Sequence, residues 1–148
     1  MKILAIDPGS EESAYCIIKG DYSIITFGKC SNEEILNVIQ NLGYTSVVIE
    51  MIASYGMAVG KEVFDTCVWI GRFTQASKCN VEYIYRKEEK MNLCGTMKAK
   101  DSNIRQALID RFGVVGTKKE QGWFYGFKSD IWAAYACGIV WLDKQKGE

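Results

Sequence analysis

Three acidic residues stand at the ends of apolar segments of this 148-residue sequence. Asp7 follows an apolar run at residues 3–6, Glu50 follows a second run at residues 47–49, and Asp130 opens a long apolar stretch near the C-terminus. Carboxylates that meet in space could hold one or two Mg²⁺ ions, which prefer oxygen ligands and retain water. Two such ions can activate a water molecule and stabilise the leaving oxygen when a phosphodiester is hydrolysed. Together, these three residues indicate metal-dependent hydrolysis.

Taken singly, each of the three acids has a simpler explanation. Asp7 precedes Pro8 and Gly9, and this order is an ordinary turn signal. Glu50 would be solvated at the end of a strand, and a negative charge at Asp130 is favoured at the start of a helix. A carboxylate on a strand that is buried on both faces is nevertheless costly unless a cation compensates for it. The metal interpretation therefore depends on the three residues coming together.

The apolar patterns predict the elements that would position these acids. We expect strands at residues 2–6, 14–19, 22–27, 46–49 and 81–85, and helices at 32–42, 61–78, 103–112 and 129–144. Ser31 is the expected N-cap of the first helix, with Glu34 in the capping-box position. This order predicts one α/β domain over residues 1–148, with a five-stranded mixed sheet flanked by helices. Asp7 and Glu50 would lie at the carboxyl ends of core strands, where α/β folds place their sites.

The composition removes several classes of site. The sequence has no histidine, which excludes Ser-His and Cys-His nucleophile pairs and histidine-ligated zinc. Its six cysteines form no CxxC pair and are expected to be thiols of a reducing compartment. No apolar run approaches the roughly 18 residues of a membrane span, and the N-terminus lacks a signal-peptide pattern. We therefore expect a cytoplasmic protein with no membrane contact, in which carboxylates and lysines carry any chemistry.

The charge is unevenly distributed although the net charge is zero. Residues 86–119 contain nine Lys or Arg and four Asp or Glu. A net charge of zero argues against a protein that coats nucleic acid non-specifically. A local basic region instead fits a single phosphate-binding face. The lysines of residues 86–100 are otherwise simply solvated.

Two further features have alternative interpretations. Asp101 precedes the helix expected at 103–112, so it is either the N-cap of that helix or a metal ligand. Trp123, Phe124 and Tyr125 lie in a glycine-containing segment and could stack on bases. Such an aromatic cluster more often packs a loop onto the body of the protein, and we favour that interpretation.

Four segments, which follow one another over nearly the whole chain, resemble the RuvC family of Holliday-junction resolvases, particularly the short forms carried by phages and prophages. The segments are IDPGSEESAY, VVIEM, KAKDSNIRQALIDRFG and KSDIWAAYACGI. The resemblance implies an RNase H-like fold, a homodimer, a Mg²⁺ or Mn²⁺ cofactor and paired nicking of four-way DNA junctions. Forks and flaps are alternative branched substrates. A phage-encoded protein would work in the cytoplasm of the bacterial host.

The resemblance also implies roles for individual residues. Asp7, Glu50 and Asp130 match the metal ligands of the family, and Lys100 matches a lysine that would neutralise charge on the phosphate. The family often has an acid or a histidine three residues before its last aspartate, but this chain has Phe127 there. Either a ligand is missing, or Asp101 or a lysine takes its place. The candidate DNA contacts are Arg86, Lys87, Lys90, Lys98, Lys100, Lys118, Lys119, Lys128 and, in place of an aromatic wedge residue, Tyr55.

Two other classes of protein remain as alternatives. Because one ligand position is altered, the chain could bind junctions without cutting them. An actin-like or sugar-kinase-like ATP-binding domain also begins with an acid-ended strand and a hairpin. That class needs a second phosphate loop and usually a second domain, and the short chain lacks a suitable glycine-rich repeat.

Overall fold

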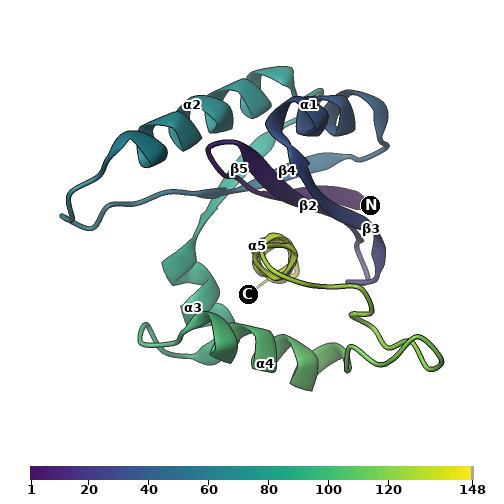
Figure 1. Cartoon of the computed structure of the whole chain (residues 1–148). Coiled ribbons are helices and arrows are strands. Elements are labelled where there is room, and N and C mark those ends of the chain that lie inside the picture. The colour runs from purple at the N-terminus through teal and green to yellow at the C-terminus, as the bar shows by residue number, and fades with distance from the viewer. Residues whose placement is uncertain (148) are drawn as a thin grey trace.

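The computed structural model describes residues 1–147, which form a five-stranded sheet with helices on both faces (Figure 1). The strands are β1 (Lys2–Asp7), β2 (Glu12–Lys19), β3 (Ile24–Ser31), β4 (Ser46–Met51) and β5 (Val81–Tyr85). The helices are α1 (Asn32–Asn41), α2 (Lys61–Ala76), α3 (Arg86–Cys94), α4 (Asp101–Phe112) and α5 (Ile131–Gln145). The strand order is β3-β2-β1-β4-β5, with β1 antiparallel to β2 and parallel to β4. The predicted mixed α/β sheet is confirmed.

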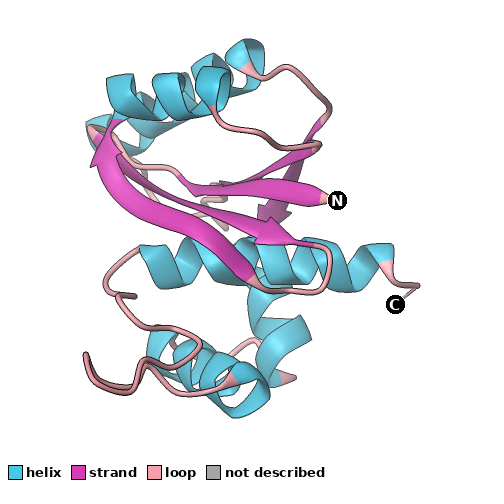
Figure 2. Cartoon of the chain, turned by 90° about the vertical axis from the view of Figure 1, so that its right-hand side faces the viewer, coloured by secondary structure: helices cyan, strands magenta, loops and turns pink. Residues whose placement is uncertain are grey.

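Strand β1 lies at the centre of the sheet and is buried on both faces. Helices α1 and α2 cover one face, and α5 lies on the other face with α3 and α4 beyond it (Figures 1 and 2). Ile3 and Ala5 belong to the hydrophobic cluster under α5, whereas Leu4 and Ile6 belong to the cluster under α1 and α2. All four side chains are fully buried, as the unbroken apolar run predicts.

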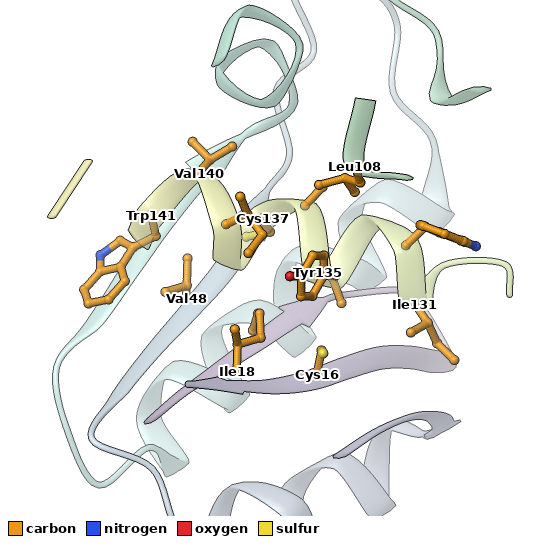
Figure 3. Close-up of a cluster of buried hydrophobic side chains, with 14 of the residues drawn as sticks. Cys16, Ile18, Val48, Leu108, Ile131, Tyr135, Cys137, Val140 and Trp141 are labelled. Carbon is orange, nitrogen blue, oxygen red and sulfur yellow. The ribbon is translucent and has the colours of Figure 1, made fainter. Parts of the chain in front are cut away.

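Helix α5 lies close against β1 and β2 because it has a glycine where it meets them. A Cβ atom on Gly138 would lie 2.5 Å from Cδ1 of Ile18 and 3.1 Å from Cβ of Ala5. Figure 3 shows Tyr135, Cys137 and Val140 of α5 near Cys16, Ile18 and Val48 of the sheet, with Leu108 of α4 nearby. This close packing fixes the position of the segment before α5, which contains Asp130.

Most predicted elements are confirmed, but the prediction for the region after β5 is wrong. We described residues 86–100 as a basic cluster and predicted no helix there, whereas residues 86–94 form α3. The first turn of α3 is closed by Glu88, whose carboxylate accepts a hydrogen bond from the Tyr85 N–H at 2.8 Å. The helix ends where Gly95 adopts a left-handed conformation, with φ of 72°.

Several element boundaries also differ from the predictions. Helix α4 begins at Asp101, so Lys100 is the N-cap and the N-cap interpretation of Asp101 is wrong. Strand β3 begins two residues later than expected and continues to Ser31. The predicted cap of α1 is confirmed, because Oγ of Ser31 accepts a hydrogen bond from the Glu34 N–H at 3.2 Å.

The composition raised two further points, the state of the cysteines and the presence of membrane-spanning helices. All six cysteines are free thiols. Cys16 and Cys137 are buried in the core, whereas Cys67 is exposed. Within residues 1–147, no helix combines the length and the apolar character that crossing a bilayer requires.

The turn after β1 leaves no room for a side chain at Gly9. A Cβ atom there would lie 2.2 Å from the carbonyl oxygen of Glu12. The turn is held in place because the Gly9 N–H donates to Oγ of Ser13 at 3.0 Å and Nδ2 of Asn32 donates to the Gly9 carbonyl at 2.9 Å. This arrangement agrees with the tight turn expected after Asp7.

Replacing Gly9 by Ala is therefore expected to lower the free energy of unfolding by about 2 kcal/mol, because backbone must move to admit the methyl group. Urea unfolding measures this loss. Gly43→Ala is the matched control, since a Cβ there meets nothing within 4 Å. Equal stabilities of the two variants would contradict the prediction.

Candidate metal centre

Asp7 and Glu50 lie side by side at one edge of the sheet. Strands β1 and β4 are parallel neighbours in which Ile6 pairs with Ile49, so the next residue on each strand is one of the two acids. Both line a pocket of about 260 Å³, together with Pro8, Arg86 and residues 51–53 and 55. The prediction that core strands deliver these two carboxylates to one place agrees with this geometry.

Two carboxyl groups in this region, those of Asp7 and Glu89, have raised pKa values and so hold their protons more tightly than usual. Burial raises the pKa of Asp7 to about 9, and the neighbouring charges of Glu50 and Asp130 add to the effect. Burial and the charge of Glu50 also raise the pKa of Glu89 well above its ordinary value. A bound cation would remove the repulsion between these acids, so the group as a whole has the electrostatics of a cation site.

Glu89 is a member of this group that our sequence analysis missed. It lies on α3, its side chain is fully buried, and neither carboxylate oxygen has a hydrogen-bond partner within residues 1–147. In the sequence it stands in a run of charges, which we interpreted as solvated. The available signal was spacing: Leu93 follows four residues later and packs on the core, so the same face of α3 points inward.

The guanidinium group of Arg86 lies among three carboxylates. Its Nη1 is 3.5 Å from Oε1 of Glu50 and 3.6 Å from Oε1 of Glu89. Its Nη2 pairs with the carboxylate of Asp101. Arg86 was expected to contact DNA, and Asp101 was an alternative metal ligand. The structure instead pairs them with each other at the edge of the candidate site.

Asp130 is exposed and stands at the N-cap position of α5, where it pairs with a lysine. Nζ of Lys29, on β3, lies 2.8 Å from Oδ2 of Asp130. Asp130 is close enough to Asp7 for its charge to raise the pKa of Asp7. Lys29 was not among the predicted site residues, because nothing in the sequence shows that β3 reaches the start of α5.

As the side chains stand, no three Asp, Glu, Cys or His residues in the part of the chain that the structure describes are grouped tightly enough to hold a metal ion. The predicted ligand Asp7 lies near both Glu50 and Asp130, but Glu50 pairs with Arg86 and Asp130 pairs with Lys29. The donor set nevertheless fits a hard divalent cation, because it consists of carboxylate oxygens and includes the buried oxygens of Glu89, which have no hydrogen-bond partner among the described residues.

The predicted basic contacts do not form one patch. Lys87 and Lys90 lie on α3, and Lys98 and Lys100 lie just before α4. Lys118 and Lys119 follow the opposite end of α4, in the connection to α5 (Figure 1), and Lys128 lies two residues before Asp130. Most of these side chains are exposed, as is Tyr55 at the pocket.

The aromatic segment before α5 packs mainly onto the protein, as we favoured. Phe124 is fully buried, and Trp123 stacks on Phe112 with ring centroids 5.4 Å apart. Phe127 packs on Phe27 and Trp132, with centroids 4.7 and 5.1 Å away. The position where the resemblance implied a ligand is therefore part of an aromatic cluster.

No protein-family model and no curated protein matches the sequence, but solved structures share its fold. RuvC from Thermus thermophilus superposes with a TM-score of 0.70 and 14% identity, covering 99% of this chain and 97% of that chain. T. thermophilus RuvC in complex with a Holliday-junction substrate gives a TM-score of 0.72 and 12% identity, with coverages of 99% and 96%. The chain thus has the RNase H-like α/β fold of RuvC over its whole length, as predicted.

The raised pKa of Asp7 predicts how the stability of the metal-free protein changes with pH. Between the ordinary value of 3.8 and about 9, the folded protein keeps a proton that the unfolded chain releases. The free energy of unfolding should therefore fall as pH rises across this window, by at most about 1.4 kcal/mol per pH unit for one proton. Urea unfolding in EDTA at a series of pH values measures the slope.

Asp7→Asn is the control for this pH dependence, because it removes the titrating group and leaves the rest of the site. Its stability should fall less steeply than that of the wild type over the same pH range. Parallel curves for the two proteins would show that Asp7 does not carry the raised pKa.

Proposed function

We propose that this protein is a metal-dependent, structure-specific endonuclease that hydrolyses phosphodiester bonds in branched DNA, with four-way junctions as its main substrate. The observation that carries the proposal is the pairing of Asp7 and Glu50 at the ends of two parallel strands, in a pocket open to solvent. The likeness to RuvC over the whole chain supports the same class of activity.

In this proposal, Asp7, Glu50 and Asp130 hold Mg²⁺ or Mn²⁺. A bound ion of this kind supplies a Lewis acid for the scissile phosphate and makes water a better nucleophile. The three carboxylates would fix the position of the ion, and Pro8 and Gly9 form the tight turn that directly follows Asp7. Lys100 is exposed beside Asp101 and would offset negative charge on the phosphate.

Branched DNA is the proposed partner. The exposed lysines on α3, before α4 and before α5 would contact phosphates of the DNA. Tyr55 is 62% exposed in the loop that lines the pocket, so its ring could stack on an opened base pair. Such a substrate would place the protein in the cytoplasm.

We also propose that the protein works as a homodimer. Helix α2 packs on the sheet through Ile70 and Phe73, while Phe64 and Val68 are 60% and 61% exposed on its outer side. Exposed apolar side chains grouped on one helix are typical of a subunit interface. Two copies of the site would allow two strands of a symmetrical junction to be cut.

Light scattering should find a dimer, and Phe64→Glu should shift it toward a monomer.

The test is an incision assay on a panel of branched DNAs. Four-way junctions, forks, flaps and linear duplex of matched sequence are each incubated with the protein in Mg²⁺, Mn²⁺ or Ca²⁺. The proposal expects nicks in the junctions in Mg²⁺ or Mn²⁺, and few or none in the duplex. Binding of junctions that never becomes cutting would identify a junction-binding protein instead. If the linear duplex were cut as readily as the junctions, the proposed structure specificity would be wrong.

A further inference from the structure

Glu89 is buried without the hydrogen bonds that a structural carboxylate normally has. Its side chain has no solvent exposure, and both oxygens lack hydrogen-bond partners among the described residues. Its nearest cationic atom, Nη1 of Arg86, is 3.6 Å away, which is beyond an ordinary hydrogen bond. Removing a carboxylate from water without such partners costs several kcal/mol. A buried acid in this condition needs an explanation.

Arg86 links Glu89 to the candidate metal centre. The same Nη1 atom lies 3.5 Å from Oε1 of Glu50, so one nitrogen stands between the two glutamates at the length of a loose ion pair. The other terminal nitrogen of the guanidinium, Nη2, pairs with Asp101, which is exposed. Arg86 thus has a partner that it would keep if another cation replaced it between the glutamates.

We propose that Glu89 is a ligand of the metal centre, and that Arg86 occupies the place of the cation between Glu89 and Glu50 until a divalent ion binds. The inference rests on the metal-dependent function proposed above and extends its ligand set to α3. Carboxylates from β1, β4 and α3 would then surround the ion, since the carboxyl ends of β4 and β5 lie at the same edge of the sheet.

A purely structural role for Glu89 fits the contacts less well. A buried ion pair that stabilises a fold has close geometry and further hydrogen bonds on its remaining oxygens. Glu88, one residue earlier and partly exposed, has the close contacts of a structural carboxylate: it accepts a hydrogen bond from the Tyr85 N–H and pairs with Lys144. Glu89 has only one ion pair, at 3.6 Å, among residues 1–147, and neither of its oxygens has a hydrogen-bond partner there.

The experiment compares Mn²⁺ binding by the wild type, Glu89→Gln and Glu88→Gln, using isothermal titration calorimetry of the full chain. Gln keeps the size of the side chain and removes its charge. We expect Glu89→Gln to weaken Mn²⁺ binding at least about 10-fold, while Glu88→Gln binds as the wild type does. Unchanged binding by Glu89→Gln would overturn the inference. Thermal unfolding in EDTA checks that each variant is folded.

A second measurement needs no variant. Crystals of the wild type soaked in MnCl₂ should show an anomalous peak within coordinating distance of a Glu89 oxygen, with the Arg86 side chain moved away from Glu50. A peak that contacts Asp7 and Glu50 but not Glu89 would refute the inference and leave the proposed function intact. A wild type that binds no Mn²⁺ and cuts no junction would refute the function itself.

Discussion

Asp7→Asn is expected to lower the rate of junction cleavage at least about 10³-fold while raising the melting temperature of the metal-free protein. A thousandfold loss corresponds to about 4 kcal/mol of transition-state stabilisation, a size that fits the loss of a metal ligand. The stability should rise because Asp7 is buried beside Glu50 and its pKa is raised to about 9, so folding at neutral pH requires the uptake of a proton that an Asn side chain does not need. Single-turnover cleavage and thermal unfolding in EDTA measure the two effects.

Asp110→Asn is the matched control, because Asp110 is exposed on α4 and bonds only Gln106 on the same helix. It should change neither the cleavage rate nor the melting temperature appreciably. If Asp7→Asn cut junctions as fast as the wild type, the assignment of the site would be wrong. If it lost stability in EDTA, the electrostatic account of Asp7 would be wrong.

Tyr135→Ala is expected to have the largest effect on stability, a loss of about 4 kcal/mol in the free energy of unfolding. Tyr135 is a fully buried residue of α5, and its ring contacts Phe124 and Phe127 with centroids 5.2 and 5.7 Å away. Truncation would leave a cavity between α5 and the sheet. Since Asp130 directly precedes α5, the variant should also weaken Mn²⁺ binding. Urea unfolding measures the stability.

Tyr135→Phe separates the ring from its hydroxyl group. The hydroxyl donates to the carbonyl oxygen of Tyr22 at 2.7 Å and accepts from Nε1 of Trp123 at 3.2 Å. Losing these bonds should cost about 1–2 kcal/mol. A loss for Tyr135→Ala no larger than for Tyr135→Phe would show that the core under α5 repacks.

The sheet and the first two acids could be predicted because their signals are local. Residues 3–6 and 47–49 are apolar throughout, which identifies strands buried on both faces, and an acid follows each run directly. Parallel pairing then brings Asp7 and Glu50 together without further information. The glycine turn at Gly9 was equally visible, since it needs only the residues around it.

The rest of the site depends on contacts between distant segments. Glu89 looks like a surface charge within residues 86–90, and only the packing of α3 shows that it is buried. Arg86 lies in the same charged stretch and was therefore predicted to contact DNA. Its partners in the structure, Glu50 and Asp101, come from β4 and α4. The pair between Lys29 and Asp130 joins residues 101 positions apart. No periodicity in the sequence reports such pairings.

The central claim is that these carboxylates support cleavage of branched DNA, and strand-by-strand cleavage of an immobile four-way junction tests it most directly. Each strand is labelled in turn and incubated with the wild type in Mn²⁺, with Ca²⁺ in parallel. The account predicts nicks at symmetry-related positions in two opposite strands in Mn²⁺, and binding without nicks in Ca²⁺. A junction that is bound in both ions while all four strands stay intact would contradict it.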